Sequence, residues 1–286
     1  MMEKMFQTAL DFKNLLEPKH FALRSLENLK AKVDLAGLAP AMHDLIKNRR
    51  TNGTTVIALK YEDGIVIAGD RRGSYGHVHA DDFIKVQDMG NLTFIACSGT
   101  SSYIDDLEKT LISARKYWEN IIEETIYIDG QAQLLERILR QNFEYLNVLM
   151  YVLGYYAVPI LAGYDPFLKK GRLFEFDETG GRYEKKDYVV SGSGGLLAEM
   201  VLDDRWEADL NETDAVLLAI RSVMRASRDN YTSPGTLAPI TVYSVSKTGS
   251  RILPEKKSLR LAWSLHIKDK KRRGEKAHAD FFSGKE

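Results

Sequence analysis

The chain has 286 residues, 44% of them hydrophobic and 28% charged, which is enough for one sizeable core with appendages. Its 40 basic and 40 acidic residues give a formal net charge of zero, so neither a nucleic acid nor an acidic membrane surface is the expected partner. The single cysteine, Cys97, excludes an internal disulfide. We find no signal sequence and no run of ~20 apolar residues, and we expect a cytoplasmic protein.

Residues 1–53 have a different sequence pattern from the rest of the chain. They show loose helical periodicity that is broken by Pro18, Gly37 and Pro40. Short amphipathic helices of this kind are marginally stable alone and need another surface to lie on. The pattern of a buried core begins only after Gly53, so a boundary is expected between Gly53 and Thr54.

After this boundary, blocks of strands alternate with blocks of helices. Residues 55–61 and 65–69 are rich in β-branched side chains and flank the turn 62–64, which predicts a β-hairpin. Amphipathic periodicity indicates the first two long helices, and Asn211 is a plausible N-cap for the last one. The other predicted elements are strands at 92–97, 158–163, 172–177, 187–190 and 240–245, and helices at 102–123, 131–153, from about 195, and at 212–228.

This order of elements predicts the fold class. Strands in blocks, separated by blocks of helix, do not form a parallel sheet of βαβ units. They favour an α+β architecture, a four-layer αββα sandwich in which two antiparallel sheets pack face to face. Residues 254–286 are expected to form a C-terminal tail, in which positions 259, 261, 263, 265 and 267 alternate like a strand and 268–276 is a solvated basic run.

A metal site is not expected. His77 and His79 stand two residues apart beside carboxylates, but a hydrolytic zinc ion needs at least three protein ligands. The remaining histidines fall in the leader or in the tail, so the pair is interpreted as part of a surface loop. We expect no cofactor.

Residues 191–195, Ser-Gly-Ser-Gly-Gly, precede a predicted helix and could bind a phosphate through backbone amides. The segment lacks the lysine of a P-loop and the spacing of a dinucleotide motif. It is not a nucleophile elbow either, because Ser191 stands where that motif has glycine and no core histidine is available. Cys97 lies on an apolar strand and is interpreted as a buried structural thiol.

Thr54 offers a different chemistry. A threonine hydroxyl needs a base within hydrogen-bond reach. If the Gly53–Thr54 bond were cut, the free α-amine, with an ordinary pKa of ~7.7–8.0, would suit that role. Gly53 would leave its own carbonyl accessible to the hydroxyl. The alternative is that Gly-Thr-Thr is simply a loop that enters a strand.

Several motifs that follow one another along the core decide between these alternatives. They are Thr54-Thr-Val-Ile-Ala, Gly64-Ile-Val-Ile-Ala-Gly-Asp-Arg-Arg-Gly-Ser74, Lys85-Val, Ala96-Cys-Ser-Gly99, Pro159-Ile-Leu-Ala-Gly-Tyr-Asp165, Phe176-Asp-Glu-Thr-Gly-Gly181, Gly192-Ser-Gly194 and Arg228-Asp229. Together they closely resemble the catalytic β subunit of the proteasome core particle, an N-terminal nucleophile hydrolase, particularly the bacterial, actinobacterial-type form with a long propeptide. The resemblance covers about residues 54–253.

The resemblance implies a threonine endopeptidase made as an inactive precursor. Residues 1–53 would be a propeptide removed by autocatalytic cleavage between Gly53 and Thr54, and residues 54–253 the catalytic domain. Lys85 would be a permanent cation beside the nucleophile, held by Asp70, and the amide of Gly99 would bind the oxyanion. The other implied catalytic residues are Ser193, Asp229 and Thr232.

Substrate would bind as an added strand held by Ser74 and Ser101. The positions that line the primary pocket in the family correspond to Gly73, Phe83, Gln87, Cys97 and Ser101, a mixed set that could accept apolar side chains.

The implied partners are further copies of this chain in a β ring, stacked on rings of proteasome α subunits, with an ATP-dependent unfoldase that supplies unfolded protein substrates. Two alternatives stay open. One is the related peptidase that builds six-membered rings without α subunits, although it typically has Gly-Gln where this chain has Arg71-Arg72. The other is a non-catalytic structural ring subunit of the same fold.

Overall fold

The structure is a computed structural model that describes residues 53–75, 78–80, 82–153, 156–226, 240–272 and 274, with residues 74–75, 78–80 and 144–153 described by their backbone alone. Two five-stranded antiparallel sheets form its centre. The first sheet has the strand order β10-β1-β2-β11-β12 and the second has the order β5-β6-β7-β8-β9. The strands of the first sheet are β1 (Val56–Tyr61), β2 (Gly64–Asp70), β10 (Tyr188–Ser191), β11 (Ile240–Ser246) and β12 (Gly249–Ile252).

The second sheet consists of β5 (Val86–Gly90), β6 (Thr93–Gly99), β7 (Ala157–Asp165), β8 (Lys170–Phe176) and β9 (Arg182–Lys185). A small hairpin, β3 (Gly73–Tyr75) and β4 (Val78–Ala80), forms a separate two-stranded sheet. The helices are α4 (Ser101–Ile122), α5 (Ile128–Leu153), α6 (Gly195–Arg205), α7 (Glu212–Ala226) and α8 (Glu255–Arg272).

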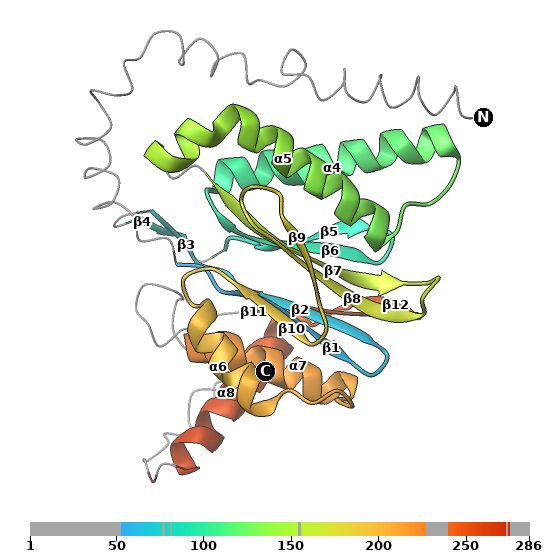
Figure 1. Cartoon of the computed structure of the whole chain (residues 1–286). Helices are drawn as coiled ribbons and strands as arrows, with labels where there is room; N and C mark the ends of the chain where they lie inside the picture. The colour runs from blue at the N-terminus through green and yellow to red at the C-terminus, as the bar shows by residue number, and fades with distance from the viewer. Residues whose placement is uncertain are drawn as a thin grey trace.

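The two sheets lie between two layers of helices (Figure 1). Helices α4 and α5 cover the outer face of the second sheet, and α6, α7 and α8 cover the outer face of the first. A third apolar cluster, which includes Val56, Ile65 and Phe94, fills the space between the sheets. The predicted four-layer αββα sandwich is therefore confirmed.

Burial on both faces explains the composition of the central strands. All seven residues of β2 are buried, and its sequence Gly-Ile-Val-Ile-Ala-Gly-Asp is almost continuously apolar, because each face packs against a different layer. The predicted hairpin is confirmed, and the structure shows its register: β1 pairs with β2 from Val56 opposite Gly69 to Tyr61 opposite Gly64. The predicted N-cap is also confirmed, since Asn211 Oδ1 accepts a 3.0 Å hydrogen bond from the amide of Asp214.

The prediction of a strand after residue 254 is wrong. Residues 255–272 form helix α8, in which Ala262 and Leu265 are buried against the cluster under the first sheet. Apolar residues at 261, 262 and 265 also fit a helical stripe, and this periodicity brings Ala262 and Leu265 to the same face. The helix therefore adds a third covering element to the first sheet.

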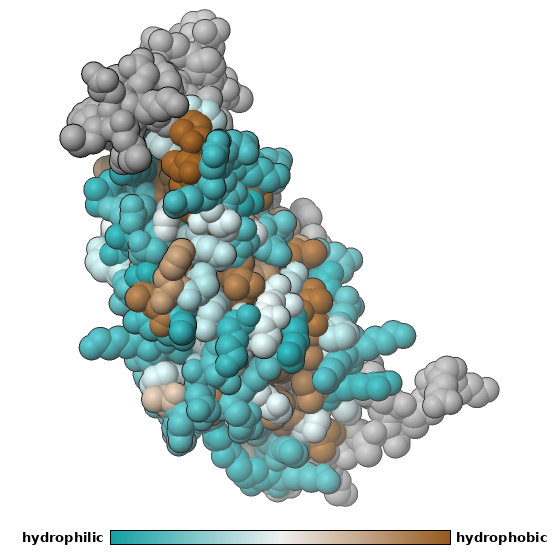
Figure 2. Space-filling view, turned by 90° about the vertical axis from the view of Figure 1, so that its right-hand side faces the viewer, coloured by the Kyte–Doolittle hydropathy of each residue, from teal (hydrophilic) through white to brown (hydrophobic). Residues whose placement is uncertain are grey.

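Figure 2 shows one face of the molecule, on which apolar residues form small groups between hydrophilic ones. Exposed apolar side chains such as Phe167 and Leu196 are normal on protein surfaces when they are scattered. Within the described ranges, no helix combines the length and hydropathy that a membrane-spanning segment requires.

Candidate active site

Thr54 lies just before β1 and is 9% exposed. Strand β1 pairs with β10 so that Val56 stands opposite Ser191. This register brings the loop after β10 to Thr54. The backbone amide of Thr54 donates a 3.3 Å hydrogen bond to Ser193 Oγ, and its carbonyl accepts one of 3.1 Å from the amide of Gly194.

A buried ion pair lies on the other side of Thr54. Lys85 Nζ donates to both carboxylate oxygens of Asp70 at 2.9 Å, and the two side chains are 3% and 1% exposed. The carboxylate also accepts hydrogen bonds from the amides of Thr55 at 2.6 Å and Arg72 at 3.0 Å. These contacts fix Asp70 at the end of β2, and through it they fix Lys85.

Lys85 makes one further contact. Its Nζ atom donates a 2.8 Å hydrogen bond to the carbonyl oxygen of Gly53. The structure therefore holds the uncut Gly53–Thr54 bond between a lysine on the carbonyl side and a serine on the amide side. Lys85 polarises this carbonyl, since an ammonium donor draws electron density toward the oxygen.

Burial alters the acid–base behaviour of the pair. Burial lowers the pKa of Lys85 and is opposed by the carboxylate of Asp70, while burial raises the pKa of Asp70 and is opposed by Lys85. The positive charge of Lys85 depends on its partner, and the lysine is easier to deprotonate than an exposed one.

Two glycines allow close backbone approaches around the site, one at Thr54 and one at Tyr156. Gly192 has φ +96°, and a Cβ there would lie 2.3 Å from the carbonyl oxygen of Thr54. Gly99 has φ +134°, and a Cβ there would lie 2.1 Å from the carbonyl oxygen of Tyr156. Both the left-handed backbone and the lack of space require glycine at these positions.

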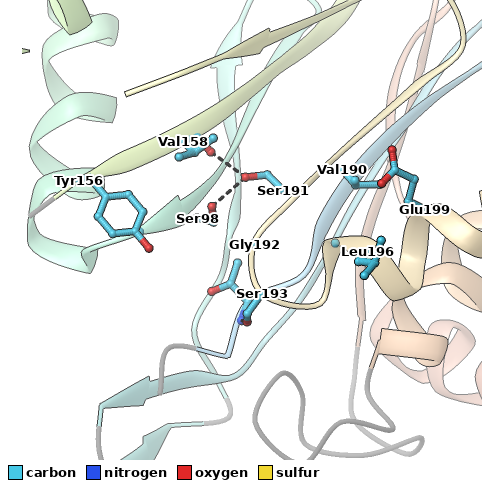
Figure 3. A pocket seen from close by; sticks show the side chains of 12 residues that line it. Ser98, Tyr156, Val158, Val190, Ser191, Gly192, Ser193, Leu196 and Glu199 are labelled. Carbon is cyan, nitrogen blue, oxygen red and sulfur yellow. Dashed lines mark hydrogen bonds between the residues drawn. The ribbon is translucent and has the colours of Figure 1, made fainter. Parts of the chain in front are cut away.

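A cleft of about 440 Å³ opens beside Thr54 (Figure 3). Ser98 and Ser191 link the two sheets here through a 2.7 Å contact between their hydroxyls, and Ser191 Oγ also donates to the carbonyl of Val158 at 3.1 Å. Further residues of the cleft come from the start of α6, where Leu196 and Glu199 form part of the wall.

Sequence reasoning missed the roles of Ser98, Tyr156 and Glu199 in this cleft. The alternation of β6 could have indicated that Ser98 faces the opposite side from Cys97 and Gly99. No pattern in the sequence indicates that Tyr156, which comes after a long helix, returns to the same place.

The structure brings five of the predicted catalytic residues to this site. Asp70 and Lys85 form the ion pair that reaches Gly53, Ser193 accepts a hydrogen bond from the amide of Thr54, and Gly99 lines the cleft together with Thr54. The predicted catalytic residues Asp229 and Thr232 lie outside the described residues, as does the side chain of Ser74.

The predicted substrate-binding residues lie on several different elements. Gly73 begins β3, Phe83 precedes Lys85, Gln87 is exposed on β5, and Ser101 is exposed at the start of α4. None of these residues lines the 440 Å³ cleft. Cys97 is buried, as predicted, and burial first and the nearby Glu108 second raise the pKa of its thiol.

The structure argues against a phosphate site in residues 191–195. The amide of Gly194 donates to the carbonyl of Thr54, and the amide of Gly195 donates to the carbonyl of Gly192. Two of the amides that would bind a phosphate are therefore already bonded within the chain.

Two antiparallel sheets between helical layers, with a threonine directly ahead of the first strand, define the N-terminal nucleophile hydrolase fold. A sequence model of the family of proteasome subunits matches residues 51–239. The chain therefore belongs to the proteasome subunit family.

Its relatives in this family include β subunits of actinobacteria. It is 32% identical over 202 residues to a proteasome subunit beta of Jonesia denitrificans, covering 70% of this chain and 65% of that protein, just under two thirds of its length. It is 32% identical over 206 residues to the subunit of Frankia alni, covering 70% and 73%. The subunit of Streptomyces griseus is 29% identical over 220 residues, covering 75% and 76%.

Proposed function

We propose that this protein is a threonine endopeptidase, the catalytic β subunit of a proteasome core particle, made as an inactive precursor. Its nucleophile is Thr54, and cleavage between Gly53 and Thr54 releases residues 1–53. One observation carries the proposal: Lys85 Nζ lies 2.8 Å from the carbonyl oxygen of Gly53, while the amide of Thr54 is bonded to Ser193.

Self-cleavage uses this geometry directly. The hydroxyl oxygen of Thr54 adds to the carbonyl carbon of Gly53, and the resulting oxyanion is stabilised by Lys85. The carbon–nitrogen bond then breaks, the hydroxyl proton passes to the nitrogen, and the acyl group stays on the threonine oxygen as an ester. Water hydrolyses the ester, which frees the propeptide with a carboxylate and Thr54 with an α-amine.

The mature residue carries both groups that peptide hydrolysis needs. The α-amine, with an ordinary pKa of ~7.7–8.0, takes the hydroxyl proton during attack and returns it to the leaving nitrogen. Ser193 orients the amine, and the amide of Gly99 donates to the oxyanion of the substrate. Asp229 and Thr232 complete the proton relay by their resemblance to the family pattern.

The acyl side of the substrate binds along β3, β5 and the start of α4. Ser74 and Ser101 hold its backbone as an added strand. The first side chain before the scissile bond lies among Gly73, Phe83, Gln87, Cys97 and Ser101.

We further infer that the chain forms a homo-oligomeric β ring, stacked on rings of proteasome α subunits in the cytoplasm, and that an ATP-dependent unfoldase passes unfolded proteins through the α ring. The family membership and the β-subunit relatives support this assembly. The number of subunits per ring, measured by electron microscopy, separates it from the six-membered peptidase that lacks α subunits.

Peptide hydrolysis tests the activity. The purified wild type should cleave fluorogenic peptides, and Thr54→Ala should reduce the rate to background, because the variant has no nucleophile. The matched control is Thr55→Val, which changes the neighbouring hydroxyl and leaves Thr54 in place. Undiminished hydrolysis by Thr54→Ala contradicts the proposal, and a wild type that is correctly assembled but inactive favours the structural subunit.

A further inference from the structure

The cleft beside Thr54 contains an acidic residue that the proposed mechanism does not use. Glu199 lies on α6 and lines the cleft together with Thr54, Ser193 and Leu196. Among the described residues that line the cleft, it is the only one with a charged side chain. Figure 3 shows Glu199 and Leu196 on the α6 side and Tyr156 on the opposite side.

The carboxylate of Glu199 has no hydrogen-bond or ion-pair partner in the described part of the chain. Among the described residues, Glu199 acts on the cation Lys185 only weakly, because the pKa of Lys185 is raised first by its hydrogen bond to Glu175 and lastly by Glu199. Lys185 is bonded to Glu175 at 2.8 Å, so it does not neutralise Glu199 by direct contact. Within the described residues, the cleft therefore presents a negative charge without a bonded partner, beside Val190 and Leu196.

The geometry around Thr54 shows which part of a substrate would enter this cleft. Lys85 contacts the carbonyl of Gly53 and so marks the acyl side of the scissile bond. The amine of Thr54 must return its proton to the leaving nitrogen, and the backbone nitrogen that becomes this amine donates a hydrogen bond to Ser193. The leaving nitrogen and the residue that carries it therefore lie on the Ser193 side, where the loop leads into α6.

We propose that the cleft binds the side chain of the first residue after the scissile bond, and that Glu199 selects lysine or arginine there. Lysine and arginine place apolar methylene groups along apolar walls and keep the charged end separate. Val190 and Leu196 suit the methylene groups, and Glu199 suits the charge. A glutamate at the same substrate position is repelled. This inference rests on the proposed peptidase function.

Internally quenched peptides that differ only in this residue, arginine, leucine or glutamate, test the proposal. For the wild type, kcat/KM should be highest for arginine and lowest for glutamate. Glu199→Gln should lower the ratio of arginine to glutamate by about tenfold, the size of one charge-assisted hydrogen bond, and Glu199→Lys should reverse the order. Glu178→Gln, a change at an exposed residue outside the cleft, is the control and should leave the ratio unchanged.

Two results would overturn the selectivity. One is an unchanged ratio in both Glu199 variants. The other is an equal loss on all three peptides, which would mean that Glu199 acts on the amine of Thr54 or on the fold. A peptidyl aminocoumarin amide has no amino acid after the scissile bond. Its hydrolysis therefore distinguishes a failure of the selectivity proposed for Glu199 from a failure of the proposed peptidase function. If the wild type cleaves the amide but shows no preference among the peptides, only the role of Glu199 fails; if it cleaves no substrate, both proposals fail.

Discussion

Lys85 Nζ contacts the carbonyl oxygen of Gly53 at 2.8 Å while it is bonded to both carboxylate oxygens of Asp70 at 2.9 Å. The ammonium thus links the cleavage site to the end of β2. Since Asp70 is held by two backbone amides as well, the position of Lys85 is set by the sheet and not by a flexible loop.

Lys85→Met should abolish self-cleavage, because the oxyanion at Gly53 loses its donor. It should also lower the free energy of unfolding by about 3–5 kcal/mol, the usual effect of leaving a buried charge unpaired. Gel electrophoresis of the expressed chain reports cleavage, and urea denaturation reports stability.

The double variant Asp70→Asn with Lys85→Met separates the two effects of the lysine. It removes both charges, so most of the stability should return while cleavage stays absent. Efficient cleavage by this stable double variant would show that Lys85 is not needed for the reaction.

Gly192→Ala should stop self-cleavage by displacing Thr54, because its Cβ would lie 2.3 Å from the carbonyl oxygen of Thr54. Gly249→Ala is the matched control, since Gly249 also has a positive φ, +119°, but has no heavy atom within 4 Å of the added Cβ. The control should cost about 1 kcal/mol of stability and leave cleavage intact. Equal cleavage by both variants would contradict the tight approach at Thr54.

Stability should depend on the protonation of Glu108. Burial first, and the nearby Asp105 second, raise the pKa of Glu108 from 4.5 to about 7. The folded state therefore keeps this proton between pH 4.5 and pH 7, and the stability that Glu108 contributes is complete below pH 4.5 and is lost as the pH rises through about 7.

Glu108→Gln removes this dependence. As the pH rises from about 4.5 to about 8, the free energy of unfolding of the variant should increase by on the order of 2 kcal/mol relative to that of wild type. Urea denaturation at each pH measures this difference. The exposed Glu178→Gln serves as the control. A difference between Glu108→Gln and wild type that stays constant across this range would refute the buried, protonated carboxyl group.

Thr55→Val should stabilise the protein by about 1 kcal/mol. The side chain of Thr55 is fully buried, and its hydroxyl has no hydrogen-bond partner among the described residues. Valine has the same shape without the cost of a buried, unpaired hydroxyl. Thermal denaturation measures the effect, and a fall in the midpoint would indicate that the hydroxyl has a favourable partner.

Much of the fold could be predicted because its long elements have strong patterns. The hairpin of β1 and β2 and the helices α4, α5 and α7 are indicated by β-branched runs or by amphipathic periodicity. The short strands β3, β4, β9 and β12 carry little pattern in three or four residues. Helix α8 was misread because alternation from Leu259 to Ile267 resembled a strand over a few residues.

The candidate site was predicted only in part. The motifs around Thr54, Asp70, Lys85, Gly99 and Ser193 are local in sequence, and the resemblance could identify them. The cleft could not be predicted, because Tyr156 and Glu199 reach it through the pairing of distant strands and the start of α6. The bond between Lys85 and the carbonyl of Gly53 likewise depends on the register of the folded sheets.

Intact mass spectrometry of the assembled particle tests the central claim most directly. Purified wild-type chains should lose the mass of residues 1–53 over time and begin at Thr54, in step with the rise of peptidase activity. Thr54→Ala chains should keep their full mass. A fully active wild-type particle whose chains retain residues 1–53 would contradict the account.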